Sequence, residues 1–454
     1  MTTTIRARFG TAKEDLKRKR KPSGWVLEKQ KVTFADPDRW TNIDTDVTPV
    51  HPPSSVIAVG LTWREAIICL IFGSLLDTIP MVLNGAIGAH LRVPFPVAAR
   101  SSFGFYFARF AVVVRMVTAL FWHAIQTYTG STAITQCIRA IWPSYLDIPN
   151  HIPESVGITS QQLISHCLFW AIQFPVLLTP PHKLKWFFVF KAVTVLVVGV
   201  AMVITMTSKA GGTGGIWDQK YEVSGSTRSW LILSCMMSVA GGWATMATNI
   251  PDFTRYLKDP NGVYWQAFFL PAIKLLLGIF GIICTSCARV VYGNASSLQR
   301  FMSGLAAFLA PISAIMACDY WLVKHRAVDV PSLYRRHARY RYQYGINWRA
   351  AVAFLVSIAP NLPGLAAAVN TSIELSDGIK HVWDMYYIWG LSSAFFVYWA
   401  LNYFWPAEKT IISRAIHQDV EVMDGMEVVN DGVHTPEPIG EVEKKVSDPV
   451  VQTV

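Results

Sequence analysis

The sequence predicts an all-α polytopic membrane protein, and three observations support this prediction. Hydrophobic residues make up 52% of the 454 residues and charged residues only 15%, whereas soluble domains carry roughly 25% charged residues. Mean hydropathy is +0.32. Apolar stretches of about 20 residues, long enough to cross a bilayer as helices, recur along the chain. Together these features argue against a disordered chain or an ordinary soluble enzyme.

Nine stretches have the length and composition of membrane spans. We expect each to be a helix, because backbone groups in lipid find no water to bond and must pair within their own segment. The predicted spans are residues 64–86, 107–130, 162–180, 186–207, 229–249, 264–288, 301–323, 349–369 and 384–405.

The connections between the spans orient the chain, because cytoplasmic loops carry an excess of Lys and Arg. The loop after the seventh span is strongly basic, and the loops after spans one, three and five also carry cations. We therefore expect these four loops and the C-terminal tail to be cytoplasmic. Two glycosylation sequons, at Asn294 and Asn370, then fall on the outer side. The basic residues after span seven are Lys324, Arg326, Arg335, Arg336, Arg339 and Arg341.

The chain divides into a basic N-terminal tail (1–54), a membrane domain (55–405) and an acidic C-terminal tail (406–454). Eleven basic residues lie between Arg6 and Arg39, which predicts a cytoplasmic tail beside the membrane rather than nucleic-acid binding. Yet a single span separates this tail from the next cytoplasmic loop. Either the tail is translocated against this rule or one helix is missing between Arg39 and Trp63, and we favour the missing helix.

Enzyme chemistry is not expected. The sequence contains no GxSxG, HExxH or P-loop motif and no clustered His, Asp and Glu with the spacing of metal ligands, so we predict no catalytic, metal or cofactor site. Cys284 and Cys287 form a CxxC, but they lie in an apolar run and we interpret them as packing residues. Lys444 and Lys445, the only cations in residues 418–454, are hypothetical targets of ubiquitination machinery.

A few polar or flat side chains inside the spans are candidates for ligand binding. Trp122 and Gln126 are spaced i, i+4 and share one helix face, where an indole and a carboxamide can stack on a flat ring and bond its edge. The pair Gly241-Gly242, followed by Trp243, allows a helix break in mid-membrane, as in many transporter sites. The alternative in both cases is ordinary helix packing. Ionisable residues in spans are functional candidates by default, and Lys274 lies deepest.

Longer motifs occur over about residues 55–405. They are LNGAIGAHLRVPFPVAARSSFG (83–104), LFWHAIQTYTG (120–130), PPHKLKW (180–186), GGWATMATNIPDFTRY (241–256), DYWLV (319–323), YGINWRA (344–350) and PNLPGL (360–365). In sequence and in order these motifs resemble those of a known family, the nucleobase-cation symporters of the fungal uracil/allantoin/uridine permease branch.

The resemblance implies a fold of twelve helices, ten of them in two inverted five-helix repeats. It also implies a plasma-membrane protein that imports a nucleobase-like heterocycle, such as uracil or allantoin, with Na⁺ or H⁺. By motif match, Trp122 and Trp243 would sandwich the ring and Gln126 would bond its edge. A permease for thiamine or a nucleoside is the alternative within the family.

The sequence departs from the family pattern at two junctions. The family's first helix, expected between residues 42–50 and 54–56, is absent, and this is the helix that the charge pattern also requires. Helices eight and nine are absent after residues 290–294. The family holds its cation between helices one and eight, so the resemblance implies that this site is missing here. The permease domain is then incomplete, which leaves open a non-transporting membrane protein.

Overall fold

The computed structural model describes residues 56–57, 60–153, 158–180, 183–214, 216–218, 223–288, 295–370 and 373–417. Apart from two isolated bridges, the regular structure in these ranges is helical. The basic tail, most of the acidic tail with Lys444 and Lys445, and most of both junctions with predicted missing helices lie outside the described residues. Those predictions therefore remain untested.

The helices follow the predicted spans closely. The first half of the chain forms α4 (Trp63–Leu91), α5 (Phe95–Phe103), α6 (Ala108–Ile141), α7 (Ser160–Leu177), α8 (Lys185–Ala210), α9 (Gly225–Gly241), α10 (Ala244–Asn249) and α11 (Pro251–Thr254). The second half forms α12 (Gln266–Ala288), α13 (Ala295–Cys318), α14 (Val330–Tyr334), α15 (Trp348–Ile358), α16 (Leu362–Val369), α17 (Asp377–Asp384) and α18 (Tyr386–Phe404).

Local sequence explains where α4, the helix at the centre of the bundle, begins and ends. Thr62 and Glu65 form a capping box at its start, which satisfies backbone N–H groups that have no partner within the helix. At its end Arg92 takes a left-handed conformation with φ 59° and donates its N–H to the Gly88 carbonyl. The apolar residues between these caps make α4 long enough to cross a membrane.

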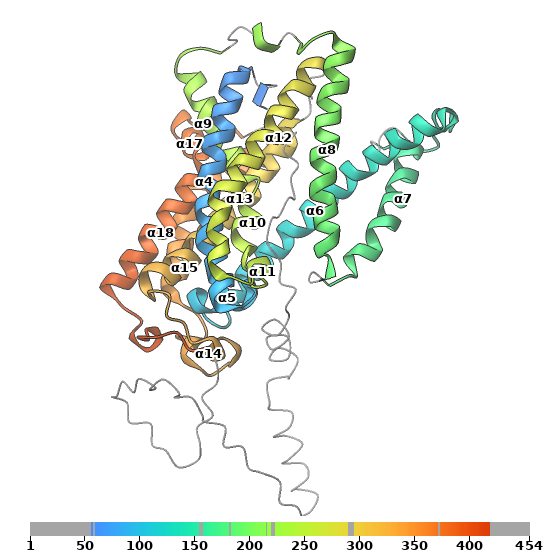
Figure 1. Ribbon diagram of the computed structural model, residues 1–454. Coiled ribbons are helices and arrows are strands. Elements are labelled where there is room, and N and C mark those ends of the chain that lie inside the picture. Colours follow the sequence, from blue (N-terminus) through green and yellow to red (C-terminus); the bar gives the residue numbers. More distant parts are fainter. Residues whose placement is uncertain are drawn as a thin grey trace, which may run out of the picture. The chain divides into compact units, whose positions relative to one another are not determined.

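Two groups of helices form the body of the bundle (Figure 1). α4 packs against α9, α10, α11 and α12, while α13 packs against α15 and α18. α13 also contacts α9, α10 and α4, so it joins the two groups. α8 packs on α12, and α6 packs mainly on α7. Figure 1 shows the second half of α6 running beside α7, outside the two groups.

Two predicted spans are interrupted. Residues 229–249 are divided between α9 and α10, with Gly242 and Trp243 in the turn that separates them. Residues 349–369 form α15, a 3₁₀ turn, Ala359–Asn361, and α16, which together make one segment long and apolar enough to cross a membrane. Pro360 lies in that turn, and proline lacks the N–H that an uninterrupted helix requires.

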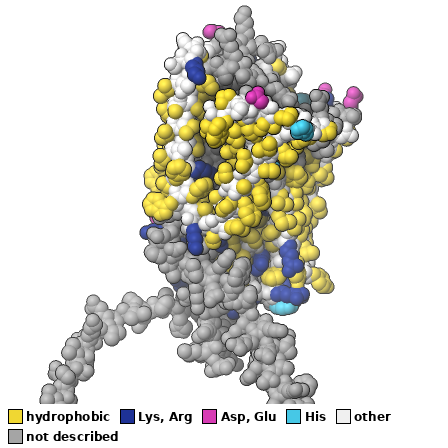
Figure 2. All heavy atoms as spheres, turned by 90° about the vertical axis from the view of Figure 1, so that its right-hand side faces the viewer, with side chains coloured by type: hydrophobic (Ala, Val, Ile, Leu, Met, Phe, Trp, Pro, Cys, Tyr) yellow, Lys and Arg dark blue, Asp and Glu magenta, His cyan; other side chains and the backbone are white. Residues whose placement is uncertain are grey.

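Six helical segments among the described residues are long and apolar enough to cross a membrane. They are Trp63–Leu91, Ala108–Ile141, Trp186–Ala210, Pro260–Cys284, Gly304–Val323 and Trp348–Ala368. Figure 2 shows hydrophobic side chains covering the middle of the visible face, with most of its Lys and Arg near the lower end and its acidic side chains near the upper end. This distribution is typical of a polytopic membrane protein. The count of nine spans remains a prediction.

Close packing of α4 on α11 gives a testable consequence. A Cβ at Gly88 would touch the Thr254 hydroxyl and lie 2.7 Å from the Pro251 carbonyl oxygen. We expect Gly88→Ala to lower stability by about 1–3 kcal/mol through overpacking. The melting temperature of the detergent-solubilised protein measures this. Gly212→Ala is the control, because a Cβ there meets nothing within 4 Å. Equal melting temperatures for the two variants would contradict the packing.

Candidate functional site

The interruption between α9 and α10 is the first part of the candidate site. α9 ends at Gly241 and α10 begins at Ala244. A Cβ at Gly241 would collide with the Tyr386 hydroxyl and lie 3.0 Å from the Ala306 Cβ. Gly241 is therefore required by close approach of α18 and α13. Tyr386 donates its hydroxyl to the Met237 carbonyl at 2.8 Å, which ties α18 to the last turns of α9.

A buried ion pair lies beside this interruption. Lys274 Nζ on α12 is 3.0 Å from Asp77 Oδ2 on α4. Lys274 is 4% exposed and Asp77 is fully buried. Tyr387 on α18 donates its hydroxyl to Asp77 Oδ1 at 3.1 Å. Asp77 thus accepts hydrogen bonds from two different helices while sitting on a third.

The same ammonium group contacts Trp243, the residue at the interruption. Lys274 Nζ lies 4.4 Å from the centroid of the Trp243 ring. A desolvated cation in this position is attracted to the negative face of the indole by about 2 kcal/mol. Trp243 also packs against Met81, Met246 and Ile250 and is only partly buried. One face of its ring therefore contacts the Lys274 ammonium group, while part of the Trp243 side chain stays accessible.

Sequence reasoning placed Lys274 among the candidates but missed Asp77. The signal was present, since Asp77 is a carboxylate in the otherwise apolar stretch 64–86, and an intramembrane carboxylate usually has a buried partner. What periodicity does not reveal is which of the other helices supplies that partner. The contact between α4 and α12 brings Asp77 and Lys274 together.

α10 is held in place by a polar contact to its neighbours. The Asn84 amide on α4 donates to the Ala247 carbonyl at 3.0 Å and to Ser313 Oγ at 2.7 Å. Ser313 Oγ on α13 in turn donates to the Ala247 carbonyl at 3.0 Å. Thr248 Oγ1 on α10 also donates to the Leu309 carbonyl on α13 at 3.4 Å. These bonds give a six-residue helix a defined position between α4 and α13.

The other two predicted site residues lie on the part of α6 that packs on α7. In that region Thr127 Oγ1 donates to Gln173 Oε1 at 3.1 Å, and Gln173 Nε2 lies 3.2 Å from His123 Nδ1. Trp122 and Gln126 belong to the same turns of α6. Within the described residues no ring contact joins Trp122 to Trp243. The grouping of Trp122, Gln126 and Trp243 around one substrate therefore remains a prediction.

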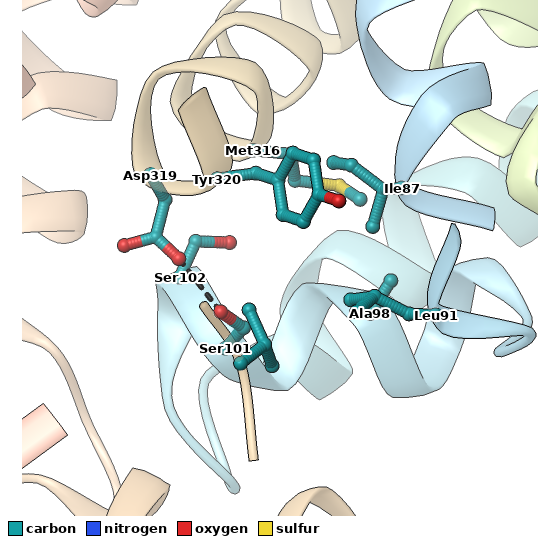
Figure 3. A pocket seen from close by; sticks show the side chains of 9 residues that line it. Ile87, Leu91, Ala98, Ser101, Ser102, Met316, Asp319 and Tyr320 are labelled. Atoms are coloured by element: carbon teal, nitrogen blue, oxygen red, sulfur yellow. Dashed lines mark hydrogen bonds between the residues drawn. The ribbon is translucent and has the colours of Figure 1, made fainter. Parts of the chain in front are cut away.

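A second buried ion pair lies at the far end of α13, outside the predicted site. Asp319 Oδ2 is 2.6 Å from Lys324 Nζ and accepts from Ser101 Oγ at 2.7 Å, and Tyr398 donates to Asp319 Oδ1 at 2.8 Å. Figure 3 shows Asp319 and Ser101 at one side of a small pocket, which Ile87 and Leu91 also line. The pocket has room for roughly one water molecule, so it does not fit a heterocyclic ligand.

Neighbouring polar groups secure the loop after α4. Asp252 Oδ1 accepts from the Phe95 N–H at 2.8 Å, and the Arg92 guanidinium donates to the Arg255 carbonyl at 3.2 Å and to the Lys258 carbonyl at 3.1 Å. Burial raises the pKa of Asp252, although the Phe95 amide and the nearby Arg255 act in the opposite direction. No group of three or more His, Cys, Asp and Glu side chains in the described ranges is placed to hold a metal ion.

The buried pair Asp77–Lys274 predicts strong coupling in stability. Asp77→Asn or Lys274→Met alone strands one charge in the bundle, which costs about 3–5 kcal/mol. The double variant removes both charges, so we expect it to be more stable than either single variant. Melting temperatures of the four purified proteins measure the coupling. Additive losses would contradict an ion pair, and Lys380→Met, which disrupts an exposed pair with Asp377, should have little effect.

With this geometry described, comparison with known proteins identifies the family. The family profile described as "Permease for cytosine/purines, uracil, thiamine, allantoin" matches residues 53–297 and 287–390. An uncharacterized permease of Schizosaccharomyces pombe is 28% identical over 460 residues, covering 83% of this chain and 82% of the relative. The uracil permease of Saccharomyces cerevisiae is 25% identical over 456 residues, covering 79% of this chain and 71% of the relative.

A solved structure shares the fold. Mhp1, a nucleobase-cation-symport-1 family transporter in a closed conformation with bromovinylhydantoin bound, superimposes with a TM-score of 0.57. It is 20% identical, and the match covers 80% of this chain and 90% of Mhp1. The helices of this chain are therefore arranged as in Mhp1. The two segments matched by the profile extend over most of the membrane domain, and the chain belongs to the family of permeases for cytosine and purines, uracil, thiamine and allantoin.

Proposed function

We propose that this protein is by ancestry an importer of a flat, nucleobase-like heterocycle across the plasma membrane together with Na⁺ or H⁺, and that uracil and allantoin are the first substrates to test. Family membership and the relatives named uracil permease and allantoin permease support the proposal. The observation that carries it is the position of Trp243. This aromatic ring stands at an interruption of a membrane helix, where many secondary transporters bind their substrates.

Stacking on Trp243 is the proposed binding contact. A base stacked on an aromatic side chain gains about 1–3 kcal/mol, and this contact needs no particular pattern of ring substituents. Trp122 would cover the opposite face of the substrate and Gln126 would bond its edge. Because both lie on the part of α6 that packs on α7, this arrangement requires a conformation in which that part of α6 approaches α10.

We further propose that the permease domain lacks the family's helices one, eight and nine, and with them the cation site between helices one and eight. The family profile supports an interruption, since its two matched segments meet at residues 287–297. The S. cerevisiae uracil and allantoin permeases are each covered over only 71% of their length. Sequencing of the transcript across codons 45–60 and 290–300 tests this: in-frame sequence encoding further helices would contradict it.

A non-transporting membrane protein is the second candidate function. It is favoured by one observation: the segment of α6 that carries Trp122 and Gln126 packs on α7. Such a protein would reach the membrane and bind a heterocycle without accumulating it. In either case we propose a cytoplasmic C-terminus, supported by the basic loop after α13, and ubiquitination machinery acting on Lys444 and Lys445.

Uptake measurements in a host that lacks its own uracil and allantoin permeases test the proposal. In a chain with helices one, eight and nine restored, we expect labelled uracil or allantoin to accumulate, Trp243→Ala to reduce the uptake about tenfold or more through loss of stacking, and Trp243→Phe to retain much of it. Trp265→Ala is the matched control, because Trp265 is 67% exposed. Uptake unaffected by Trp243→Ala would overturn the site, and correctly localised protein without uptake would favour the non-transporting alternative.

The proposed stacking of the substrate between Trp122 and Trp243, with Gln126 bonding its edge, has its own test, which applies to a chain with the three helices restored. There we expect Trp122→Ala or Gln126→Ala to abolish or sharply reduce uptake while the protein still reaches the membrane, because each removes one substrate contact. Uptake assays combined with localisation of a tagged protein measure this. Unchanged uptake in both variants would remove these residues from the site.

A further inference from the structure

We propose that Lys274, held in place by Asp77, is a specificity-determining residue. Its ammonium group covers one face of the Trp243 ring, so that the site accepts neutral or anionic flat rings and rejects cationic ones. This inference rests on the proposed function, because it concerns the Trp243 ring on which the substrate is proposed to stack. It adds a residue that the motif match does not assign and narrows the class of substrate.

The first step is that the charge is held in place. Lys274 Nζ is 3.0 Å from Asp77 Oδ2 and 4.4 Å from the Trp243 ring centroid. Asp77 is in turn bonded by Tyr387. The lysine is 4% exposed, so its ammonium cannot exchange these partners for water. Three helices therefore fix the position of this charge against Trp243.

The second step is electrostatic. The face of an indole is negative and attracts cations. Here a cation already lies against the ring, and in the described residues it is the one cationic group in that position. A second cation stacked on Trp243 would meet a like charge across the ring, in surroundings of low dielectric where charges interact more strongly than in water. A neutral or electron-rich ring meets no such repulsion.

Asp77 does not cancel this effect at the ring. The pair carries no net charge, but its two ends are at different places: the ammonium contacts the indole, whereas the carboxylate accepts hydrogen bonds from Lys274 and Tyr387. The pair therefore acts as a dipole whose positive end is in contact with Trp243. Such a dipole favours electron-rich rings over cationic rings at short range.

The family description includes substrates of both kinds. Uracil and allantoin are neutral at pH 7 and their ring N–H groups are weak acids, whereas the thiazolium ring of thiamine carries a permanent positive charge. The geometry at Trp243 therefore assigns this chain to transport or binding of the uncharged group, and it argues against thiamine as a substrate.

Competition measurements test the assignment. In cells expressing the protein, the uptake of labelled uracil or allantoin is inhibited with the unlabelled base and, separately, with thiamine, and the ratio of the two inhibition constants is compared between variants. The test variant is Asp77→Asn/Lys274→Met, which removes both charges and leaves no unpaired one. Lys274→Arg keeps the charge. Lys191→Met is the control, since Lys191 also lies over an aromatic ring, 5.4 Å from Phe188, but on α8.

We expect thiamine to inhibit the unaltered protein poorly. In the double variant we expect the inhibition constant for thiamine to fall about tenfold relative to that for the base. Lys274→Arg and Lys191→Met should leave the ratio unchanged. A purely structural role for Lys274 would weaken both ligands together without changing the ratio. An unchanged ratio in the double variant, or thiamine competing as well as the base against the unaltered protein, would overturn the inference.

Failure of the proposed function gives a different result. If the protein takes up neither base, the transport proposal fails. Binding of uracil, allantoin and thiamine is then compared through the increase that each causes in the melting temperature of the purified protein. Stabilisation by a neutral base but not by thiamine supports the inference without transport. Equal stabilisation by thiamine overturns the inference alone, and no stabilisation by any of the three overturns both.

Discussion

The need to satisfy buried polar groups without water is the constraint on which this structure depends. Inside a membrane an unpaired charge or carbonyl is costly, so each polar side chain in the bundle also determines which helices lie together. Asp77 joins α4 to α12 and α18. Asn84, two turns further along α4, joins it to α10 and α13. The face of α4 that carries these two residues thus fixes the positions of four other helices.

The same principle operates at the far end of the bundle. There the pair Asp319–Lys324 is enclosed by hydroxyls from Ser101 and Tyr398. The glycines complement these polar contacts, since Gly241 and Gly88 allow a tyrosine and a backbone carbonyl to come closer than any side chain would permit. Polar contacts select the partners of a helix, and small residues set the distance at which they pack.

Hydropathy and motif spacing were sufficient to predict the positions of the helices, because a span of about 20 apolar residues has few alternatives in lipid. They also singled out Gly241-Gly242 and Trp243, where the structure interrupts the helix. The partner of Lys274 was not predictable, because pairing depends on how α4 and α12 face each other. Within residues 349–369, Pro360 explains the 3₁₀ turn between α15 and α16, because proline lacks the N–H that a regular helix requires. The position of Trp122 and Gln126 depends on which part of α6 packs on α7 and which part on α10, and no local pattern reveals this.

The pair Asp77–Lys274 also has an electrical consequence. Moving one elementary charge through the full membrane field is worth about 2.3 kcal/mol per 100 mV. With both side chains ionised and 3.0 Å apart, the pair behaves as a small dipole, and the field exerts almost no net force on it. A shift of α4 and α12 together would therefore involve little electrical work. Current that accompanies activity of this protein has to be carried by the transported species or by other charged groups.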